Sequence, residues 1–321
     1  MKKPKIKYSL LKILTGSDLS RRQLPLMVVE SSLKDPVVWL TACGHGDEVG
    51  GIVVVQEIFK MIRKRGLLRG SLYAFPLMNP IGFETNARSI TLTREDLNRS
   101  FPGNSSGSLG ERVANKIFTS IIETKPTLVL DLHNDWIKSI PYTLLDPYPG
   151  PVHKEAYEKT KIFGEKTGLL IIREKEELNR SLSYSIIKKD IPALTLELGE
   201  SYVVNEMNIE CGVKSIWNIL AYLKMTEPLE KFFNYPLPKG YQGKILDYLD
   251  KPLSPTSGII RFLVKPGTFV KKNQPIAKIY NVFGKLQETM LAFSNSIVLG
   301  HSDSSVAFPG TSVMAFGITP N

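Results

Sequence analysis

Short, almost continuously apolar runs alternate with longer amphipathic runs through the first two-thirds of this chain. The apolar runs are strand-like and cover residues 36–43, 71–78, 127–132 and 193–198. Between them, helices are predicted over residues 48–64, 109–123 and 154–167. Strands without a polar face are typical of a mainly parallel sheet that helices cover on both sides, so the pattern predicts an α/β domain.

The character of the chain changes near residue 226. The segment TEPLEKFFNYPLPKG holds three prolines and a glycine, which is typical of a linker. Beyond it, short strands are predicted at 259–264, 275–280 and 296–299, with turn signals between them and no convincing helix. The sequence therefore predicts a large domain over residues 1–228, a linker over 229–240 and a small all-β domain over 241–321.

The formal net charge of +10 would suit an acidic partner, but the excess is unevenly spread. Residues 1–35 hold eight Lys or Arg against three acids, which gives 8 − 3 = +5, half of the excess. The other basic residues do not alternate with aromatic residues, as a base-stacking surface would require. We therefore expect no nucleic-acid partner.

The N-terminal run MKKPKIKYSLLKILTG is similar to a secretion signal only in outline. Lys12 interrupts its apolar part and no small-residue cleavage site follows. No apolar run reaches membrane-spanning length, and the only two cysteines, Cys43 and Cys211, do not make a disulfide framework. The expectation is a cytoplasmic protein with no membrane partner, and the sequence leaves a homo-oligomer open.

Three of the apolar runs end on side chains that can bind a metal ion or act on a metal-bound water. His45 and Glu48 follow the first run, His133 follows the third, and Glu197 lies in the fourth. In an open α/β sheet, ligands gather outside the carboxyl ends of the strands, so we expect these side chains to meet. Two histidines, one carboxylate ligand and a further free carboxylate make up a hydrolytic zinc site with an open position.

Supporting signals surround these residues. Asp131 precedes His133 by two residues and so shares its face of the strand, where its carboxylate could orient the imidazole. Gly44 and Gly46 would allow a tight turn. Each signal is weak alone: a His-x-x-Glu pair occurs by chance, Asp-Leu-His can be a structural strand end, and Glu197 can pair with a lysine. Their convergence on one edge of the sheet favours a site.

A long polar loop, MNPIGFETNARSITLTREDLNRSFPG at residues 78–103, connects a predicted strand to a predicted helix. Loops of this length inside a compact domain are commonly functional. Asn98 and Arg99 could hold a carboxylate, the arginine through a bidentate pair. The competing interpretation is a surface ion-pair network of Arg94, Glu95 and Asp96, which composition alone does not exclude.

Five motifs in order resemble the succinylglutamate desuccinylase and aspartoacylase family, a branch of the zinc carboxypeptidase-like enzymes. They are His45-x-x-Glu48, an Asn-Pro pair followed by Arg88, Asp96-Leu-Asn-Arg-x-Phe-Pro-Gly103, Asp131-Leu-His133 and Thr195-Leu-Glu-Leu-Gly199. The segment GIIRFLVKPGTFVKKNQPIAKI is similar to the family's appended β domain. The resemblance implies a mixed, mainly parallel sheet flanked by helices, followed by a small biotinyl- or lipoyl-like β domain.

The same resemblance implies a single Zn²⁺ per chain with three protein ligands, His45, Glu48 and His133. Glu197 would be the general base, and Arg88 would stabilise the oxyanion. Asn98 and Arg99 would grip the carboxylate of the substrate. Arg88 stands farther before Asn98 than in the aspartoacylases proper, so Arg94 competes for its role.

The expected activity is that of a zinc-dependent amidohydrolase, which cleaves a non-peptide amide in an N-acyl amino acid or a similar small carboxylate-bearing molecule. A metallocarboxypeptidase that acts on peptides or cell-wall fragments is the alternative enzyme. A non-catalytic binding module on the same scaffold is the alternative from another class.

Two parts of the expected site have no firm assignment. Tyr202, Tyr241 and Tyr248 are all candidates for a substrate-contacting tyrosine. The C-terminal segment has no lysine in a convincing carrier hairpin, since Ser294-Asn295-Ser296 stands near where one would be sought. We expect that segment to shape or cover the site rather than to carry a prosthetic group.

Overall fold

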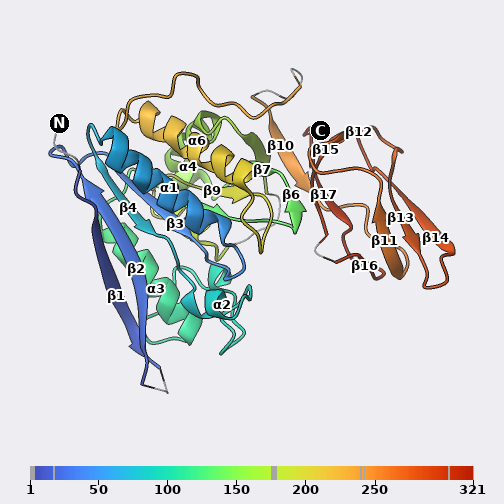
Figure 1. The fold of residues 1–321 in the computed structure, drawn as a ribbon, viewed down its shortest axis with the longest axis horizontal. Helices are drawn as coiled ribbons and strands as arrows, with labels where there is room; N and C mark the ends of the chain where they lie inside the picture. The colour runs from blue at the N-terminus through green and yellow to red at the C-terminus, as the bar shows by residue number, and fades with distance from the viewer. Residues whose placement is uncertain are drawn as a thin grey trace.

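The structure is a computed structural model that describes residues 4–16, 19–174, 179–238, 241, 243–302 and 304–320. Helices lie on both faces of a long mixed sheet, and the C-terminal strands continue from one end of it (Figure 1). The predicted α/β fold is therefore confirmed.

The centre of the sheet is parallel. β4 (Ser71–Phe75), β3 (Val37–Ala42), β5 (Leu128–His133) and β9 (Ala193–Leu198) lie side by side in that order and run in the same direction. Every residue of β3 and β5 is buried, as expected of strands that helices cover on both faces. Their carboxyl ends therefore meet at one edge of the sheet.

Antiparallel strands flank this centre on both sides. β1 (Lys7–Thr15) and β2 (Arg21–Glu30) form a ribbon that pairs with β4. On the other side, β7 (Pro141–Leu145) runs antiparallel to β9, and β8 (Leu170–Arg173) runs parallel to β7. The strand direction thus reverses between β9, which carries Glu197, and β7.

The two faces of the sheet bury different clusters. α1 (Gly50–Arg65) and α6 (Glu206–Tyr222) pack on one face against Leu128, Leu130 and Leu132 of β5, and α4 (Lys154–Lys166) lies against α6. α3 (Leu109–Glu123) and α5 (Leu182–Ile187) pack on the other face against Val129. Because side chains alternate along a strand, Asp131 and His133 point to the same face as Val129.

Three short helical segments lie in the loops: α2 (Pro80–Glu84), η1 (Leu97–Arg99) and η2 (Pro151–His153). The polar loop at 78–103 contains the first two of them. Asn79 caps α2, since its side chain accepts a hydrogen bond from Gly82 N at 2.9 Å, and Asp96 caps η1. The loop is therefore held by its own short-range hydrogen bonds.

Among the described residues, the C-terminal part is all β, as predicted. β10 (Ile245–Leu249) joins β8 in parallel, and the main sheet continues through β17 (Met314–Ile318), β15 (Ser296–His301) and β12 (Phe269–Val270), with β6 (Lys138–Ser139) on β15. A second sheet is formed by β14 (Leu286–Leu291), β13 (Pro275–Tyr280), β11 (Gly258–Phe262) and β16 (Val306–Ala307). The domain boundaries at 228 and 241 stay a prediction.

The predicted strands and helices agree with the structure to within a few residues, but several elements had no clear signal. The β1–β2 ribbon was not predicted. Only two of the ten residues of β2 are fully buried, so its sequence shows little alternation of apolar and polar residues. α6, β7, β8 and β10 were not predicted either.

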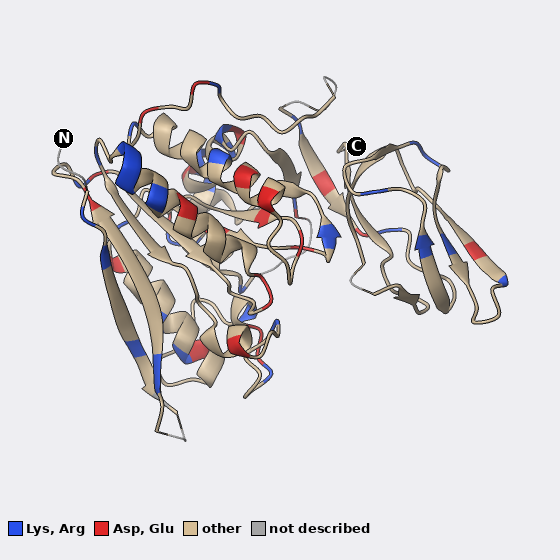
Figure 2. Cartoon of the chain, viewed as in Figure 1, with Lys and Arg blue, Asp and Glu red and all other residues tan. Residues whose placement is uncertain are grey.

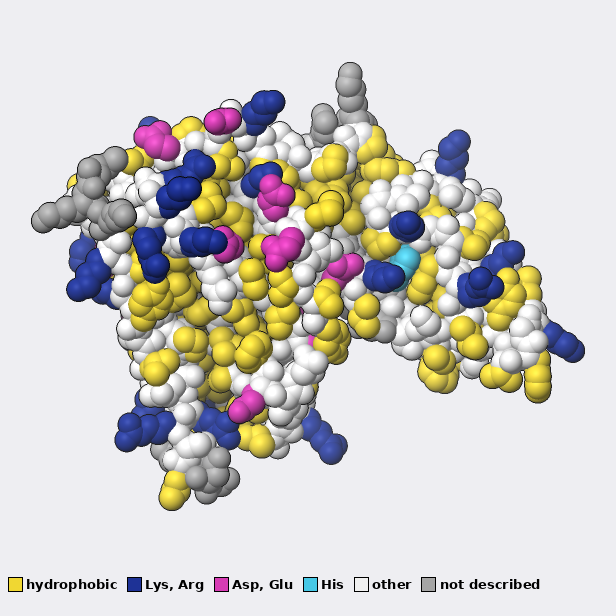
Figure 3. Space-filling view, viewed as in Figure 1, with side chains coloured by type: hydrophobic (Ala, Val, Ile, Leu, Met, Phe, Trp, Pro, Cys, Tyr) yellow, Lys and Arg dark blue, Asp and Glu magenta, His cyan; other side chains and the backbone are white. Residues whose placement is uncertain are grey.

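Charged side chains of both signs are spread over the helices and strands (Figure 2). On the face seen in Figure 3, Lys and Arg side chains lie among acidic and apolar ones. Lys2 and Lys3, which add to the N-terminal excess of charge, lie outside the described residues. Within the described ranges, no helix combines the length and apolar character needed to cross a membrane.

Candidate active site

Two strand ends bring three metal-binding side chains together. His45 and Glu48 lie in the turn between β3 and α1, and His133 is the last residue of β5. One ligand atom from each of them lies within 4.8 Å of the other two. Their exposed fractions are 3%, 2% and 3%, respectively. The structure thus juxtaposes the three residues expected to bind a metal, while ligation itself stays a prediction.

The turn after β3 depends on a close backbone approach at Gly46. A Cβ there would lie 1.9 Å from the carbonyl carbon of Gly82 in α2, so only glycine fits. A Cβ on Gly44 would meet no heavy atom nearer than 3.3 Å, and the left-handed conformation of the turn belongs to Cys43, with φ of 54°. The tight path expected from two glycines is present, and Gly46 is the residue that requires it.

Both histidines turn the same ring nitrogen toward Glu48. Nδ1 of His45 lies 2.6 Å from Glu48 Oε1, and Nδ1 of His133 lies 2.8 Å from Oε2. On the far side of each ring, Nε2 of His45 lies 3.1 Å from Asp96 Oδ1, and Nε2 of His133 lies 2.9 Å from Asp131 Oδ2. Metal-binding histidines characteristically donate their second N–H to a carboxylate in this way, which orients the ring.

Orphaned acceptors lie at the point these groups face. Oε2 of Glu48 is buried and receives no hydrogen bond among the described residues, although His133 Nδ1 is close to it. Oε2 of Glu197 is also buried, and it too has no hydrogen-bond partner among the described residues. Two imidazole nitrogens, a carboxylate and a nearby second carboxylate match the donor set of a catalytic zinc site. The residues present therefore fit a zinc ion.

The electrostatics of the cluster favour a cation. Burial favours the neutral form of His133, but the carboxylates of Asp131 and Glu48 outweigh it and raise the pKa of His133 well above its usual value. Burial likewise opposes ionisation of Glu48, but the two histidine rings outweigh it and lower the pKa of Glu48. The acids around the two rings thus favour positive charge at the place where a divalent cation would put it.

Glu197 lies beside this cluster on the neighbouring strand. It is the register partner of His133 in the parallel pair of β5 and β9, and it lines the same cavity, of about 160 Å³. Burial, reinforced by the negative charge of Asp135, raises the pKa of Glu197 well above its usual value. The carboxyl group is therefore placed to exchange a proton with a molecule bound in the cavity.

Of the two arginines that compete for the oxyanion role, Arg88 lines the cavity. Its Nη2 lies 3.1 Å from Asp96 Oδ2, and its Nη1 lies 3.9 Å from Glu48 Oε1. Arg94, the competing candidate, is exposed and has φ of 60°, and it is not among the described residues that line the cavity. The geometry favours Arg88 over Arg94 for contact with a bound molecule.

Asn98 and Arg99 line the cavity from η1. Asn98 Oδ1 accepts a hydrogen bond from Leu182 N at 2.9 Å, and its Nδ2 lies 3.5 Å from His133 Nε2. Arg99 Nη1 donates to the carbonyl oxygen of Asn98 at 3.0 Å, and the side chain is exposed. The amide is thus fixed next to the histidine, while the guanidinium can reach an anion at the opening.

The sequence did not single out Asp96, which contacts both His45 and Arg88. It gave Asp96 no role of its own and named it only in the Asp-Leu-Asn-Arg motif and, as the competing interpretation, in a surface ion-pair network with Arg94 and Glu95. In the structure, Glu95 binds Ser108 and the backbone N–H of Gly110. The available signal was the position of Asp96 at the start of the Asp-Leu-Asn-Arg run.

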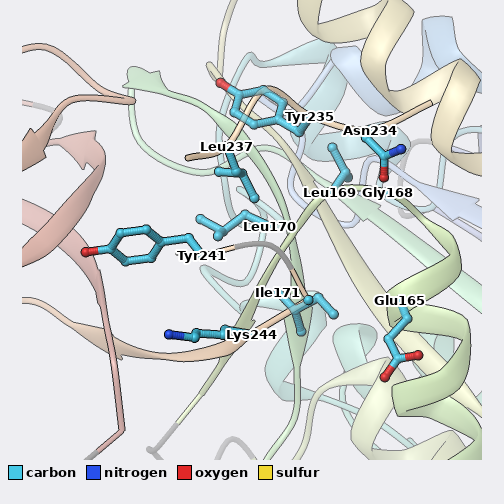
Figure 4. Close-up of a pocket in the computed structure, with 11 residues that line it drawn as sticks. Glu165, Gly168, Leu169, Leu170, Ile171, Asn234, Tyr235, Leu237, Tyr241 and Lys244 are labelled. Carbon is cyan, nitrogen blue, oxygen red and sulfur yellow. The ribbon is translucent and has the colours of Figure 1, made fainter. Parts of the chain in front are cut away.

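Only one of the three candidate tyrosines lines the cavity. Tyr248, in β10, does so, and its hydroxyl accepts a hydrogen bond from Trp136 Nε1 at 3.2 Å. Tyr202 is half-exposed and donates its backbone N–H to Asp47 O. Tyr241 lines a different cavity, of about 270 Å³, formed with Leu170 of β8 and shown in Figure 4. The C-terminal part thus contributes Tyr248 to the site.

Comparison with known families identifies the region that carries this site. Residues 34–223 match the model of the succinylglutamate desuccinylase/aspartoacylase catalytic domain. A curated relative, the N-alpha-acetyl-L-2,4-diaminobutyric acid deacetylase of Halomonas elongata, is 26% identical over 272 residues, which cover 81% of this chain and 74% of the relative. The family match over residues 34–223 includes the β3–α1 turn, the polar loop, β5 and β9.

Solved structures share the fold over most or nearly all of the chain. The product-bound ectoine utilization protein EutE (DoeB) from Ruegeria pomeroyi has a TM-score of 0.82 at 19% identity and covers 99% of this chain and 97% of its own. A metallo-carboxypeptidase from Burkholderia cenocepacia has a TM-score of 0.54 at 16% identity and covers 70% of this chain and 65% of its own. The carboxypeptidase-like character of the fold is thereby confirmed.

Proposed function

The chain belongs to the succinylglutamate desuccinylase/aspartoacylase family, and we propose that it is a zinc-dependent amidohydrolase that deacylates an N-acyl amino acid or a similar small carboxylate-bearing amide. The observation that carries the proposal is the buried group of His45, Glu48 and His133 with Glu197 beside it. Each imidazole in this group has a carboxylate on its far nitrogen.

In this proposal, His45, Glu48 and His133 hold one Zn²⁺ per chain. Asp131 and Asp96 fix the orientation of the two imidazole rings. Zinc in such a site lowers the pKa of a bound water towards about 7 and polarises a carbonyl group. The buried carboxylates lower the free energy of any cation at this point, which supports metal binding by the cluster.

Glu197 is the proposed general base. Its Oε2, which receives no hydrogen bond from the described residues, takes a proton from the attacking water and gives it to the amide nitrogen as the carbon–nitrogen bond breaks. The water oxygen ends on the acyl group as a carboxylate, and the amine leaves. Arg88 supplies positive charge to the oxygen of the former carbonyl, a contribution commonly worth a few kcal/mol.

Asn98 and Arg99 are the proposed carboxylate-binding pair, because a fixed amide and an exposed guanidinium lie next to each other on η1. The Halomonas relative is named for an N-acetylated amino acid, and we propose the same general class for this chain. A cavity of about 160 Å³ suits a small amide better than a peptide. Action on peptides or cell-wall fragments, and binding without catalysis, are the competing hypotheses.

We also propose that residues 1–228 form the catalytic domain, 229–240 the linker and 241–321 a small β domain of the biotinyl- or lipoyl-like kind. Its proposed role is to complete the site, which Tyr248 of β10 supports by lining the cavity. The cytoplasmic location and the absence of a nucleic-acid partner stay predictions.

The decisive experiment combines metal analysis with turnover. Protein purified without chelators is expected to hold about one zinc per chain and to hydrolyse members of a panel of N-acyl amino acids faster than short peptides. Glu197→Gln should abolish turnover and keep the zinc, whereas His133→Ala should lose both. Glu210→Gln, on an exposed helix position paired with Lys214, is the matched control and should behave as the unmodified protein.

Loss of zinc in Glu197→Gln would show that Glu197 is a ligand rather than the base. A preference for peptides would favour the carboxypeptidase. Protein that neither holds zinc nor gains activity when zinc is added would favour the binding module.

A further inference from the structure

The candidate active site continues along the sheet to a buried carboxylate that the proposed chemistry does not use. Tyr142 of β7 pairs with Glu197, and Leu144 pairs with Thr195. All four residues line the cavity, and so does Asp146, which follows β7 on the same face. With a rise of about 3.3 Å per residue, the backbone of Asp146 lies about 13 Å along the strand from that of Tyr142.

Asp146 is buried in the wall of the cavity, and one of its carboxylate oxygens is unsatisfied. The residue is only 6% exposed. Its Oδ1 accepts a hydrogen bond from Ser181 Oγ at 3.3 Å, but Oδ2 has no hydrogen-bond partner within the described part of the chain. A buried carboxylate oxygen without a donor is costly, so its retention next to a cavity points to a donor supplied by a ligand.

The charges around Asp146 favour a cationic ligand. Glu174 also lines the cavity, and it follows β8, whose neighbour is β7; its backbone N–H donates to Leu145 O at 2.9 Å. The basic side chains in the described lining are the expected metal ligands His45 and His133, Arg88, which contacts Asp96, and Arg99, which contacts Asn98. The lining thus presents carboxylates at Asp146 and Glu174, whereas its guanidinium groups belong to the more exposed Arg88 and Arg99.

A short connection links Asn98 to Asp146. Asn98 Oδ1 accepts from the backbone N–H of Leu182, and Ser181, the preceding residue, donates its hydroxyl to Asp146. Two adjacent residues at the start of α5 thus connect Asn98, of the proposed carboxylate-binding pair, to Asp146. A carboxylate bound at Asn98 and a cation bound at Asp146 should therefore both belong to the amino acid half of the substrate.

We propose that Asp146, with Glu174 beside it, forms a cation subsite for the side-chain ammonium group of the amino acid that hydrolysis releases. This inference rests on the proposed deacylase function and names its substrate class, the N-acyl derivatives of diamino acids. The ammonium group donates to Oδ2 of Asp146, while Asn98 and Arg99 hold the carboxylate of the same molecule. Burial raises the pKa of Asp146 to about 6, against the opposing effect of the Ser183 and Ser181 hydroxyls, so the group is ionised at pH 7.

The test compares two substrates that differ only in the ammonium group. Zinc-loaded full-length protein is assayed with Nα-acetyl-L-2,4-diaminobutyrate and with N-acetyl-L-2-aminobutyrate. A charged hydrogen bond in a buried site predicts a ratio of kcat/KM values of about ten to one hundred in favour of the diamino substrate. Asp146→Asn, which keeps the shape of the side chain, should bring this ratio close to one.

Asp190→Asn is the matched control, since Asp190 is exposed and pairs with His153 away from the cavity; it should keep the full ratio. If Asp146→Asn does not fold, Glu174→Gln should still lower the ratio. A second pair, Nα-acetyl-L-ornithine and N-acetyl-L-norvaline, measures whether a longer side chain reaches the subsite.

Calorimetric binding of the products separates this inference from the proposed function. L-2,4-diaminobutyrate should bind more tightly than L-2-aminobutyrate, and Asp146→Asn should remove the difference. If no N-acyl amino acid is hydrolysed but this binding difference is found, the deacylase function fails and the cation subsite stands. Equal binding of the two products, or an equal loss for both in Asp146→Asn, would overturn the subsite.

Discussion

Two carboxylates, Asp131 and Asp96, hold the far nitrogens of the candidate zinc ligands, and their replacement by asparagine should weaken metal binding to different extents. Asparagine keeps the size of the side chain and an acceptor oxygen, so the substitution removes mainly the charge. Loss of such an orienting carboxylate typically costs about 10- to 100-fold in metal affinity, or about 1.4–2.7 kcal/mol.

The surroundings of the two acids decide where each should fall in this range. Asp131 is 1% exposed and accepts hydrogen bonds from Thr41 Oγ1 at 2.7 Å and His133 Nε2 at 2.9 Å. The Asp96 side chain is 25% exposed and also contacts Arg88. Water can compensate at Asp96 but not at Asp131, so we expect about 100-fold weaker zinc binding for Asp131→Asn and about 10-fold for Asp96→Asn.

Competition titrations with a chromophoric chelator of known zinc affinity measure both values. Asp190→Asn serves again as the control and should leave zinc affinity unchanged. Melting of the metal-free proteins separates a metal effect from a general loss of stability. A zinc affinity of Asp131→Asn within twofold of the unmodified protein, or a larger effect at Asp96, would refute the idea that buried charge behind the imidazoles sets metal affinity.

Two further predictions follow from the cavity. Arg88→Ala should lower kcat by about 10²- to 10³-fold through loss of positive charge at the reacting oxygen, whereas Arg94→Ala should change it less than twofold; similar losses in both would contradict the assignment to Arg88. The pKa of Asp146 is raised by burial from 3.8 to about 6, so its contribution favours the folded state below pH 4 and is lost as pH rises to about 6. Urea titrations should therefore show Asp146→Asn gaining about 2.4 kcal/mol over the unmodified protein between pH 4 and pH 7, and a difference independent of pH would refute the raised pKa.

The centre of the fold was predictable because its strands are buried on both faces. β3 and β5 have no exposed residue, so their sequences are almost continuously apolar up to their carboxyl ends and stand out from the amphipathic helices. The polarity of the sheet then places their carboxyl ends together, and with them His45, Glu48 and His133. The ribbon of β1 and β2 has one partly exposed face and gave no comparable signal.

The contacts made by the polar loop could not be predicted from the sequence, for a different reason. Asp96 contacts His45 across 51 positions and Arg88 across eight. Neither contact follows from a periodic pattern, because the loop takes its path from the caps of α2 and η1 and from the close approach at Gly46. Sequence spacing could mark the loop as functional, but it could not choose which of its acids turns inward.

Asp146 illustrates a signal that was present but could not be used. Alternation along a strand placed Asp131 on the face of His133, because the strand at 127–132 had been recognised. The same rule applied to β7 places Tyr142, Leu144 and Asp146 on one face, and register with β9 puts that face beside Glu197. The rule needs the strand first, and β7 spans only five residues, Pro141–Leu145, which the sequence analysis did not single out. A prediction of β7 from the sequence would therefore have added Asp146, and with it the proposed cation subsite, to the predicted metal site.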